Sequence, residues 1–323
     1  MDTFFLMLKN VLLFVLLAVP GYLLVKGKVL KSEQSSGFSQ LLSMVAVPFM
    51  IVSGTINLPL SKNTLLELLF TVVLGTALIF IFYFLSLLFV GKLNDADEGI
   101  AKKKKSMIRF CQVFANNGFL GMPLAAALFG MSSRICSYLT ILVVINNVVL
   151  YTLGFYMVSF ERKNMRLKTV LLNPVVLGFV VGLILNITGV CKVIPEIDTY
   201  VGHLKNLVTP IAMLILGMKM GDMNLSTLFK CKKLYLVSLV KLIVFPVVTV
   251  ALAYPLTVLL KKDTVSIVLA MFMSFAMPTA GLASAFADSV NGDTEGAAIY
   301  TFGTTIFSVV TIPVLFWILT AIL

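Results

Sequence analysis

The stretch from Phe114 to Pro123 lies inside an apolar segment that is long enough to cross a membrane. Two asparagines, two glycines and a proline fall within eight residues, at 116–123. Proline removes a backbone donor, and glycine adds backbone freedom, so a regular helix is not expected here. Backbone groups freed in hydrocarbon need partners. Such an interruption therefore survives only where it is buried in protein or lines a wet cavity.

A second interruption is expected near the other end of the chain. The segment 276–281 places Pro278 and Gly281 in the middle of another apolar run. Two interrupted helices at corresponding places in two halves are the best sequence indication of a transporter binding site. We therefore expect the rest of the chain to serve as a framework around this pair.

Composition sets the class of protein. The chain has 323 residues, of which 59% are hydrophobic and 12% are charged, and its mean hydropathy is +1.05. A soluble domain cannot bury that much apolar surface, so we expect an all-α polytopic membrane protein. The net charge of +11 is explained by basic loops that orient the helices, and no nucleic-acid partner is expected.

Ten segments are apolar and long enough to span a membrane. They are 4–25, 37–58, 64–91, 106–129, 134–160, 168–189, 203–221, 233–260, 264–288 and 295–322. The loops on one side, including the long loop 92–105, together with the span ends beside them, hold 17 lysines and arginines, and those on the other side hold six. Cytoplasmic loops are the basic ones, so both termini are expected to be extracytoplasmic, in a multi-pass protein of the cell membrane.

Three landmarks recur at a nearly constant offset, which indicates an internal repeat. They are Pro48 with Pro210, Pro123 with Pro278, and Asn146-Asn147 with Thr304-Thr305. The offsets are 162, 155 and about 158 residues. Five helices are an odd number, so the second copy enters the membrane from the opposite face. We expect two inverted five-helix repeats, 1–160 and 161–323, with broken helices 4 and 9 that cross near the bilayer midplane.

The breaks indicate an anion site. Each break creates a helix N-terminus, expected near Pro123 and near Pro278, with free N–H groups and the positive end of a dipole. Further candidates for substrate binding are Asn116, Asn117, Gly118, Asn146, Asn147, Thr279, Thr304 and Thr305, with Tyr151 and Ser308 beside them. Alternatives stay open: hydroxyls in membrane helices often bond their own backbone, asparagines can join helices, and Gly118 can serve the break itself.

Charges inside the spans are few. Lys241 is the one cation placed well inside a predicted helix, whereas Asp222 and Asp288 lie near helix ends. We expect Lys241 to form a structural or gating ion pair with one of them, with snorkelling or substrate contact as alternatives. Pro48 and Pro210 are expected to kink the framework helices. The lone His203 and the scattered cysteines form no metal or catalytic group, so no metal, no cofactor and no enzymatic activity are expected.

The pattern Asn-x-Gly-Phe-Leu-Gly-x-Pro at 116–123, followed by Leu128-Phe129-Gly130, resembles the auxin efflux carrier family. The segments 21–24, 45–48 and 277–281 also match its pattern, and the short joint between helices 5 and 6 resembles the bacterial branch. The resemblance implies ten helices in a sodium/proton antiporter-like or bile acid symporter-like architecture. It implies a scaffold part of helices 1, 2, 6 and 7 and a transport part of helices 3–5 and 8–10. It also implies that Asn116 helps to bind a substrate carboxylate.

The function expected is secondary transport of a small organic anion, a mono- or dicarboxylate such as malate or malonate, by elevator-like alternating access. Protons or sodium ions are candidate coupling ions, and a sodium-coupled organic-anion symporter like the bile acid carriers is the alternative. A membrane sensor that binds a metabolite without moving it is a more distant one. Membrane lipid and a second copy of the chain, in a homodimer, are the other expected partners.

Overall fold

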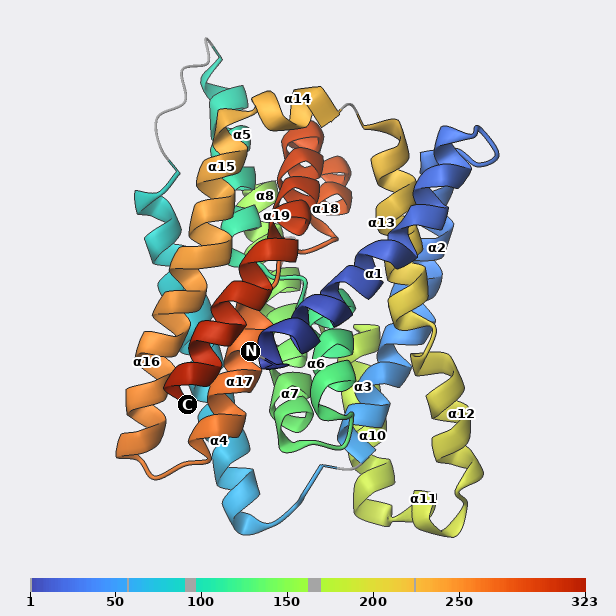
Figure 1. The fold of residues 1–323 in the computed structure, drawn as a ribbon, viewed down its shortest axis with the longest axis vertical. Helices are drawn as coiled ribbons and strands as arrows, with labels where there is room; N and C mark the ends of the chain where they lie inside the picture. The colour runs from blue at the N-terminus through green and yellow to red at the C-terminus, as the bar shows by residue number, and fades with distance from the viewer. Residues whose placement is uncertain (1, 57, 91–96, 162–169, 224) are drawn as a thin grey trace.

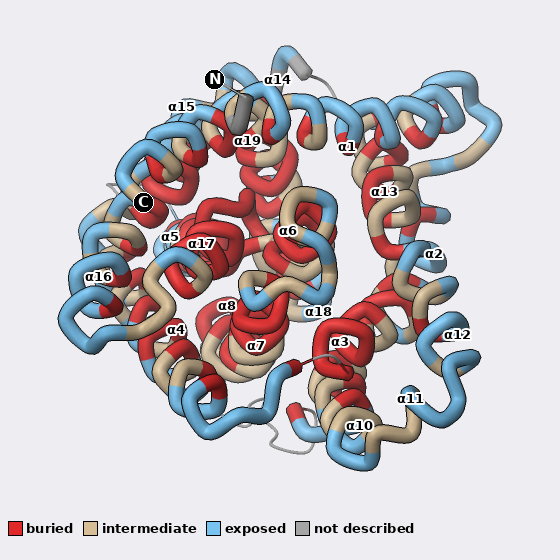
Figure 2. Tube along the Cα trace, turned by 60° about the horizontal axis from the view of Figure 1, so that its bottom comes forward, coloured by how far each residue is buried: buried red, intermediate tan, exposed pale blue. Residues whose placement is uncertain are grey.

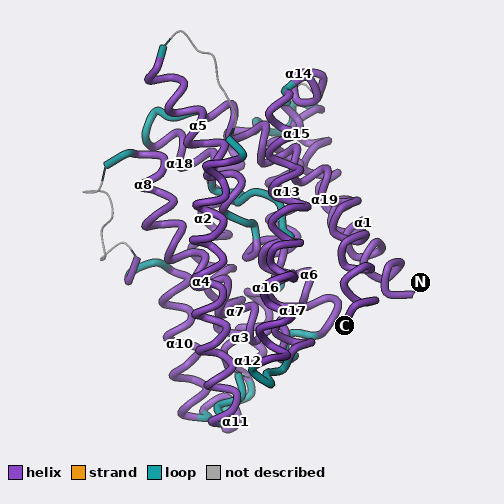
Figure 3. Tube along the Cα trace, turned by 90° about the vertical axis from the view of Figure 1, so that its left-hand side faces the viewer, coloured by secondary structure: helices purple, strands orange, loops and turns teal. Residues whose placement is uncertain are grey.

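The computed structural model describes residues 2–56, 58–90, 97–161, 170–223 and 225–323, and these residues are almost entirely helical (Figure 1). Most helices run along the long axis of the molecule, and loops gather at its two ends, with some loop also in the interior (Figure 3). The loop residue Lys92 and the basic residues within 162–168, on which the predicted orientation partly depends, lie outside the described residues.

The helices follow in this order. The first half contains α1 (Asp2–Lys26), η1 (Ser32–Gln34), α2 (Ser35–Leu41), η2 (Leu42–Ala46), α3 (Val47–Ile56), α4 (Lys62–Leu88), α5 (Glu98–Val113), η3 (Asn117–Gly121), α6 (Met122–Phe129), α7 (Arg134–Val149), η4 (Leu150–Gly154) and α8 (Phe155–Ser159). The second half contains α10 (Pro174–Thr188), α11 (Val190–Val193), α12 (Glu196–Lys205), α13 (Val208–Asp222), α14 (Leu225–Lys230), α15 (Lys232–Leu239), η6 (Val240–Val244), α16 (Phe245–Leu259), α17 (Thr264–Phe275), α18 (Ala283–Ser289) and α19 (Thr294–Ile322). Here η1 is a 3₁₀ turn, and η2, η3, η4 and η6 are π-helical turns.

Seven helical stretches within the described residues are long and apolar enough to cross a membrane. They are Phe4–Lys26, Ser32–Ile56, Lys62–Leu88, Arg134–Ser159, Glu196–Asp222, Lys232–Leu259 and Thr294–Ile322. The other three expected spans contain shorter apolar helices, Asn117–Phe129, Pro174–Thr188 and Thr264–Phe275. The polytopic membrane class is therefore confirmed, and the count of ten spans in two repeats stays a prediction.

The outer helices expose large apolar side chains, whereas the buried residues gather on α5, α6, α7 and α17 at the centre (Figure 2). Leu16 of α1, Phe84 of α4, Ile184 of α10 and Val247 of α16 are all exposed. Apolar surface of this extent suits hydrocarbon and not water. The interior helices therefore form the protein core, and the outer ones present a lipid-facing surface.

The charge run at Lys102–Lys105 lies in a helix, which corrects its expected place in a loop. The helix α5 begins at Glu98, eight residues before the expected start at 106. Asp97 caps it, because its carboxylate accepts hydrogen bonds from the N–H groups of Gly99 and Ile100. The helix therefore starts at its capping residue, even though the four lysines that follow are too polar to be part of an apolar span.

Proline explains three of the irregular turns. The π turns η2, η3 and η6 each end two residues before a proline, at Pro48, Pro123 and Pro246. Proline lacks an N–H and clashes with the carbonyl of the preceding turn, and a wider turn accommodates both defects. Pro210 differs, because it lies in the first turn of α13, where no intrahelical acceptor is needed. It follows a turn between α12 and α13, and Pro48 follows a π turn, so both prolines lie at helix irregularities.

Two helix pairs pack with their backbones in contact. On α13, a Cβ added at Gly217 would lie 1.9 Å from the carbonyl oxygen of Ala18 in α1. On α10, a Cβ at Gly178 would lie 2.6 Å from the carbonyl oxygen of Pro48 in α3. Small residues allow such close approach between membrane helices, where dispersion contacts replace the hydrophobic effect. The pairs α1–α13 and α3–α10 are therefore fixed by glycine.

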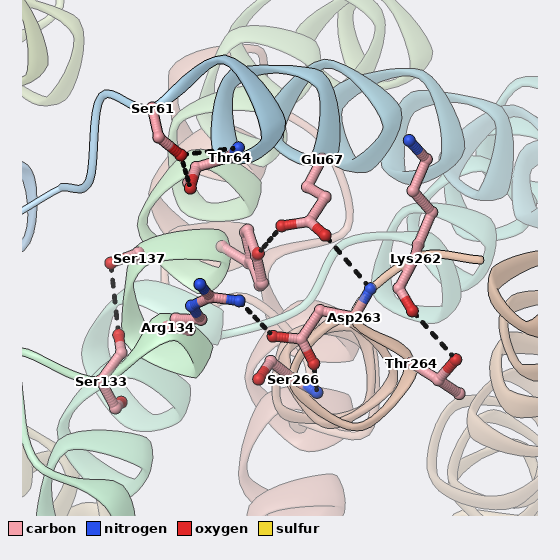
Figure 4. A network of polar contacts seen from close by, with 11 residues as sticks. Ser61, Thr64, Glu67, Ser133, Arg134, Ser137, Lys262, Asp263, Thr264 and Ser266 are labelled. Carbon is pink, nitrogen blue, oxygen red and sulfur yellow. Dashed lines mark hydrogen bonds and ion pairs between the residues drawn. The ribbon is translucent and has the colours of Figure 1, made fainter. Parts of the chain in front are cut away.

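A polar network joins the N-terminal ends of α4, α7 and α17 (Figure 4). Glu67 accepts a hydrogen bond of 2.7 Å from the Tyr138 hydroxyl and one of 3.3 Å from the backbone N–H of Asp263. Asp263 pairs with Arg134 at 3.2 Å. The three helices also begin with capping side chains, which are Ser61, Ser133 and Asp263. Local sequence signals thus start the helices, and the network holds their starts together.

We predict that Gly217→Ala will destabilise the protein in detergent by about 1–3 kcal/mol, because the added methyl group meets backbone that cannot rotate away. Thermal unfolding measures this effect. Gly202→Ala in α12 is the control, since a Cβ there meets nothing within 4 Å. Equal melting temperatures for the two variants would contradict the close packing of α1 on α13.

We predict that Tyr138→Phe will lower the stability by about 1.5–3 kcal/mol, because it removes a hydrogen bond to a charged carboxylate. Tyr138 is fully buried, so water cannot replace the lost donor. Tyr254→Phe is the control, since the partly exposed Tyr254 hydroxyl has no partner among the described residues. A melting temperature of Tyr138→Phe equal to that of the control would show that the network does not hold the three helices.

Candidate functional site

Both expected helix interruptions are present. The first runs from Phe114 to Asn116, between the end of α5 and the start of η3. The second is longer and covers 276–282, between α17 and α18. Their places differ from the prediction, because the helices resume at Asn117 and Ala283 and not beside Pro123 and Pro278. The π turn before Pro123 lets the helix begin six residues earlier.

The two interruptions bind each other through an antiparallel β-bridge between Ala115 and Thr279. The backbone N–H of Asn116 donates to the carbonyl of Pro278 at 2.8 Å. The backbone N–H of Ala280 donates to the carbonyl of Phe114 at 3.0 Å. Each break therefore supplies the partners that the backbone of the other break lacks.

Side chains from two further helices hold the bridge. Asn146 of α7 donates its amide to the carbonyl of Ala115 at 3.3 Å. Thr304 of α19 accepts from the backbone N–H of Thr279 at 3.1 Å. The Thr279 hydroxyl in turn donates to the carbonyl of Cys111 at 2.8 Å. Asn146, Thr279 and Thr304, which were all predicted as site residues, are thus brought together as supports of the crossing.

Asn117 belongs to the same supporting network. It is 1% exposed, donates its amide to the Ser274 hydroxyl at 2.9 Å and accepts from the Asn146 amide at 3.2 Å. Both ends of its side chain are therefore occupied by protein. The carbonyl oxygen of the Asn146 side chain is different, because it is buried with no partner among the described residues.

Asn116 has the geometry of a binding residue. Its backbone is fixed by the bond to Pro278, and its carbonyl accepts from the N–H groups of Leu120 and Gly121 at 3.2 Å. Its side-chain amide makes no hydrogen bond with any residue that the structure describes, and it is partly exposed. A fixed backbone with a free amide is what ligand recognition requires.

Two pockets meet at Asn116. The first, which we name the Asn146 pocket, is also lined by Asn147 and Tyr151 and has about 560 Å³ of empty space, counting its open mouth. The second, the Thr301 pocket, is also lined by Thr305 and has about 710 Å³. The residues common to both pockets are Asn116, Phe119, Gly281 and Leu282.

Other predicted residues contribute less. Asn147 and Thr305 each donate to their own helix, at Val143 and Thr301, although both line a pocket. A Cβ added at Gly118 would meet only an ordinary contact, 3.5 Å from Val143. Gly118 lines the Asn146 pocket, so it serves the pocket surface and not close packing.

The two prolines that were expected at the site, Pro123 and Pro278, do not line either of the two pockets. Pro123 lines a separate pocket beside Lys205 and Thr209, and Pro278 contributes its carbonyl to the bridge. Close packing requires a glycine at Gly121, because a Cβ added there would lie 2.6 Å from the carbonyl oxygen of Met273. These residues shape the crossing without facing the Asn146 and Thr301 pockets.

Lys241 lies beside the first break, at the end of α5. It is fully buried, and its ammonium donates to the carbonyl of Val113, the last residue of α5, at 3.2 Å. The predicted ion pair is not formed in the described part of the chain, because Asp222 and Asp288 are both exposed at the surface. A cation at a helix C-terminus is favoured by the dipole and by the free carbonyls there, so Lys241 needs no carboxylate to orient it.

Two pocket residues were missed by sequence reasoning. Thr301 lines the Thr301 pocket one turn before Thr304 and Thr305, and its buried hydroxyl has no partner among the described residues. Lys219 lines the same pocket from α13. It lies at the end of the expected span 203–221 and is one of the 17 basic residues that set the expected orientation. The rule that intramembrane charges mark function would have identified it.

Comparison with known proteins places the chain in a family. A family model described as "Membrane transport protein" matches residues 6–169 and 161–317. An uncharacterized transporter of Methanothermobacter thermautotrophicus is 25% identical over 312 residues, which cover 94% of this chain and 96% of that relative. The chain therefore belongs to the membrane transport protein family, the auxin efflux carrier family that its motif resembles, and is a membrane transporter.

Proposed function

We propose that this transporter is a secondary carrier that moves a small organic anion, a mono- or dicarboxylate, across the cytoplasmic membrane by elevator-like alternating access. The observation that carries the proposal is the free side-chain amide of Asn116, which lies where the two broken helices meet and faces two pockets. An amide N–H donates to a carboxylate at a smaller desolvation cost than a buried cation would incur.

The helix that follows Asn116 adds to the attraction. The apolar helical stretch Asn117–Phe129 begins at the pocket, and the first N–H groups of a helix have no intrahelical acceptor. They carry the positive end of the dipole. The partial positive charge at this helix end favours an anion. Protons are the coupling ions that best fit a carboxylate substrate, because the carboxylate itself can bind and carry a proton.

The hydrogen bonds that Asn146 and Thr304 make to the two breaks support the inverted repeat. Asn146 holds the first break through Ala115, and Thr304 holds the second through Thr279. These are two of the landmark positions at the repeat offset, and their partners face each other in the bridge. We therefore keep the two repeats, 1–160 and 161–323, as part of the proposal.

The proposed division into a scaffold and a transport part also has support. Both pockets are lined from both parts: the Asn146 pocket includes Val47 and Asn173 from the scaffold helices, and the Thr301 pocket includes Met213. An elevator binds its substrate at the sliding interface of the two parts. The basic loops would face the cytoplasm, with both termini outside, and the scaffold would offer the surface for a homodimer.

Sodium coupling fits the crossing less well. A sodium site at a broken helix uses the free carbonyls of the C-terminal half-turn. Here the carbonyl of Cys111 accepts from Thr279, and that of Val113 accepts from Lys241. The ammonium group thus occupies the position that a coupling cation would take at the end of α5.

We predict that Asn116→Ala will weaken substrate binding by about 10- to 100-fold, because a hydrogen bond to a charged group contributes about 1.5–3 kcal/mol. Thermal stabilisation in detergent, with malate, malonate, succinate, lactate, indole-3-acetate and a bile acid, each with and without sodium, identifies the ligand. Flux into proteoliposomes then measures the loss. A shift with sodium alone would favour the bile acid carrier alternative.

Asn10→Ala is the matched control for this experiment. Asn10 lies on α1, and its amide donates to the carbonyl of Leu6 in its own helix. We expect Asn10→Ala to transport like the wild type. Unchanged flux and binding in Asn116→Ala would contradict the proposed site, and binding without any flux would contradict transport of that ligand.

A further inference from the structure

We infer that a groove on the lipid-facing side of α16 and α19 binds one acyl chain of an anionic phospholipid, whose headgroup lies at Lys261 and Lys262. We name it the α16 groove. It shares no lining residue with the Asn146 and Thr301 pockets. The inference does not depend on which substrate the carrier moves, because it concerns a lipid held at a separate site.

The α16 groove lies between three helices. Its walls come from Pro246 to Pro255 of α16 and from Leu315 to Ile322 of α19, and the buried ring of Phe272 in α17 contributes as well. The lining contains no charged side chain, and the Tyr254 hydroxyl is its only polar side-chain group. Such walls offer an occupant dispersion contacts and almost no hydrogen-bond partners.

The size of the α16 groove suits a hydrocarbon chain. Its volume is about 460 Å³. An apolar cavity of about 150 Å³ stays dry and takes up a benzene molecule, so this groove has room for a considerably longer hydrocarbon. Along α16 the lining runs from 246 to 255, which is about 14 Å at a rise of 1.5 Å per residue. A space that extends along a helix in this way suits a chain better than a compact molecule.

The α16 groove is continuous with the lipid-facing surface. Its rim is formed by exposed apolar side chains on both helices, such as Val247 and Ile318. The exposed Val258 and Val314 extend this surface along the same two helices. Figure 2 shows the outer side of α16 as exposed and α17 as buried. The medium at the rim is therefore the hydrocarbon of the bilayer, and a lipid chain that enters gains contacts with fixed walls.

Aromatic and basic side chains indicate where the headgroup lies. Tyr254 in the groove and Trp317 on α19 are exposed, and these two residue types gather at the headgroup level of membranes. The helix α16 ends at Leu259, and Lys261 follows Tyr254 by seven residues, or about 10 Å of helix. The ammonium groups of Lys261 and Lys262 have no hydrogen-bond or ion-pair partner among the described residues. A lipid phosphate at this end would meet two uncompensated positive charges.

The α16 groove is connected to the second break through Phe272. The carbonyl of Phe272 accepts from the backbone N–H of Ala276 at 2.8 Å, at the end of α17 where the break begins. A lipid chain packed on Phe272 therefore supports the helix end from which the break starts. We expect the bound lipid to raise the melting temperature of the protein for this reason.

The test measures binding of dioleoyl phosphatidylglycerol and dioleoyl phosphatidylcholine to the delipidated protein in detergent, by native mass spectrometry and by thermal stabilisation. Ala251→Phe fills the groove from an exposed position, and we expect it to weaken both lipids by about 10-fold or more. Ala77→Phe, at an exposed alanine of α4, is the control and should leave both within about 2-fold. Ala251→Leu should give an intermediate loss, which keeps the test valid if the phenylalanine variant does not fold.

The headgroup is tested by a double variant with Lys261→Gln and Lys262→Gln. We expect it to weaken phosphatidylglycerol by about 10- to 30-fold, because each lysine at a membrane surface contributes a factor of about five, and to leave phosphatidylcholine within about 2-fold. The control is the double variant with Lys26→Gln and Lys28→Gln, which removes two exposed lysines at the end of α1 and should change neither lipid.

Three results would overturn the inference. The first is unchanged binding of both lipids in Ala251→Phe, or an equal loss in Ala77→Phe. The second is an equal effect of the Lys261 and Lys262 substitutions on the two lipids. The third concerns a second copy of the chain as the occupant: if Ala251→Phe turns a dimer into a monomer in light scattering while lipid binding stays the same, the groove is a subunit interface.

Discussion

The exchange of backbone hydrogen bonds between the two broken helices is the constraint on which the rest of the structure depends. Each break leaves polar groups unpaired in a medium where every such group costs several kcal/mol. The bridge between Ala115 and Thr279 satisfies them from the other half of the chain. Neither break is tolerable alone, so the two halves must assemble together, and the residues that surround them are fixed by this requirement.

The same exchange explains why Asn116 remains available to a ligand. The supporting bonds are made by backbone groups and by Asn146, Thr279 and Thr304, so Asn116 contributes its N–H and keeps its side chain free. Support and recognition are thus divided among neighbouring residues. In our proposal, a small anion binds where the scaffold and transport helices meet, next to this free side chain.

Much of this arrangement could be predicted from the sequence, because apolar length, proline and glycine act locally. The two breaks, and the place of Asn116 and Asn117 at the first of them, follow from residues that cannot continue a helix in hydrocarbon. The start of α5 does not follow from hydropathy, since one capping residue, Asp97, extends the helix through four lysines. The partner of Lys241 could not be predicted, because it is a backbone carbonyl in a helix 128 residues away. The place of Lys219 in a pocket wall could not be predicted, because a basic residue near a helix end is equally expected from loop charge.

The buried ammonium of Lys241 has a consequence for the response to membrane voltage. In the proposed division it belongs to the transport part, so the empty moving element carries one additional positive charge when the lysine is protonated. A charge that crosses the full field gains or loses about 2.3 kcal/mol for each 100 mV. A bound monoanion would cancel the charge and make the loaded movement indifferent to voltage. A dianion would reverse its sign, so that an inside-negative potential would drive the loaded element outward and the empty one back.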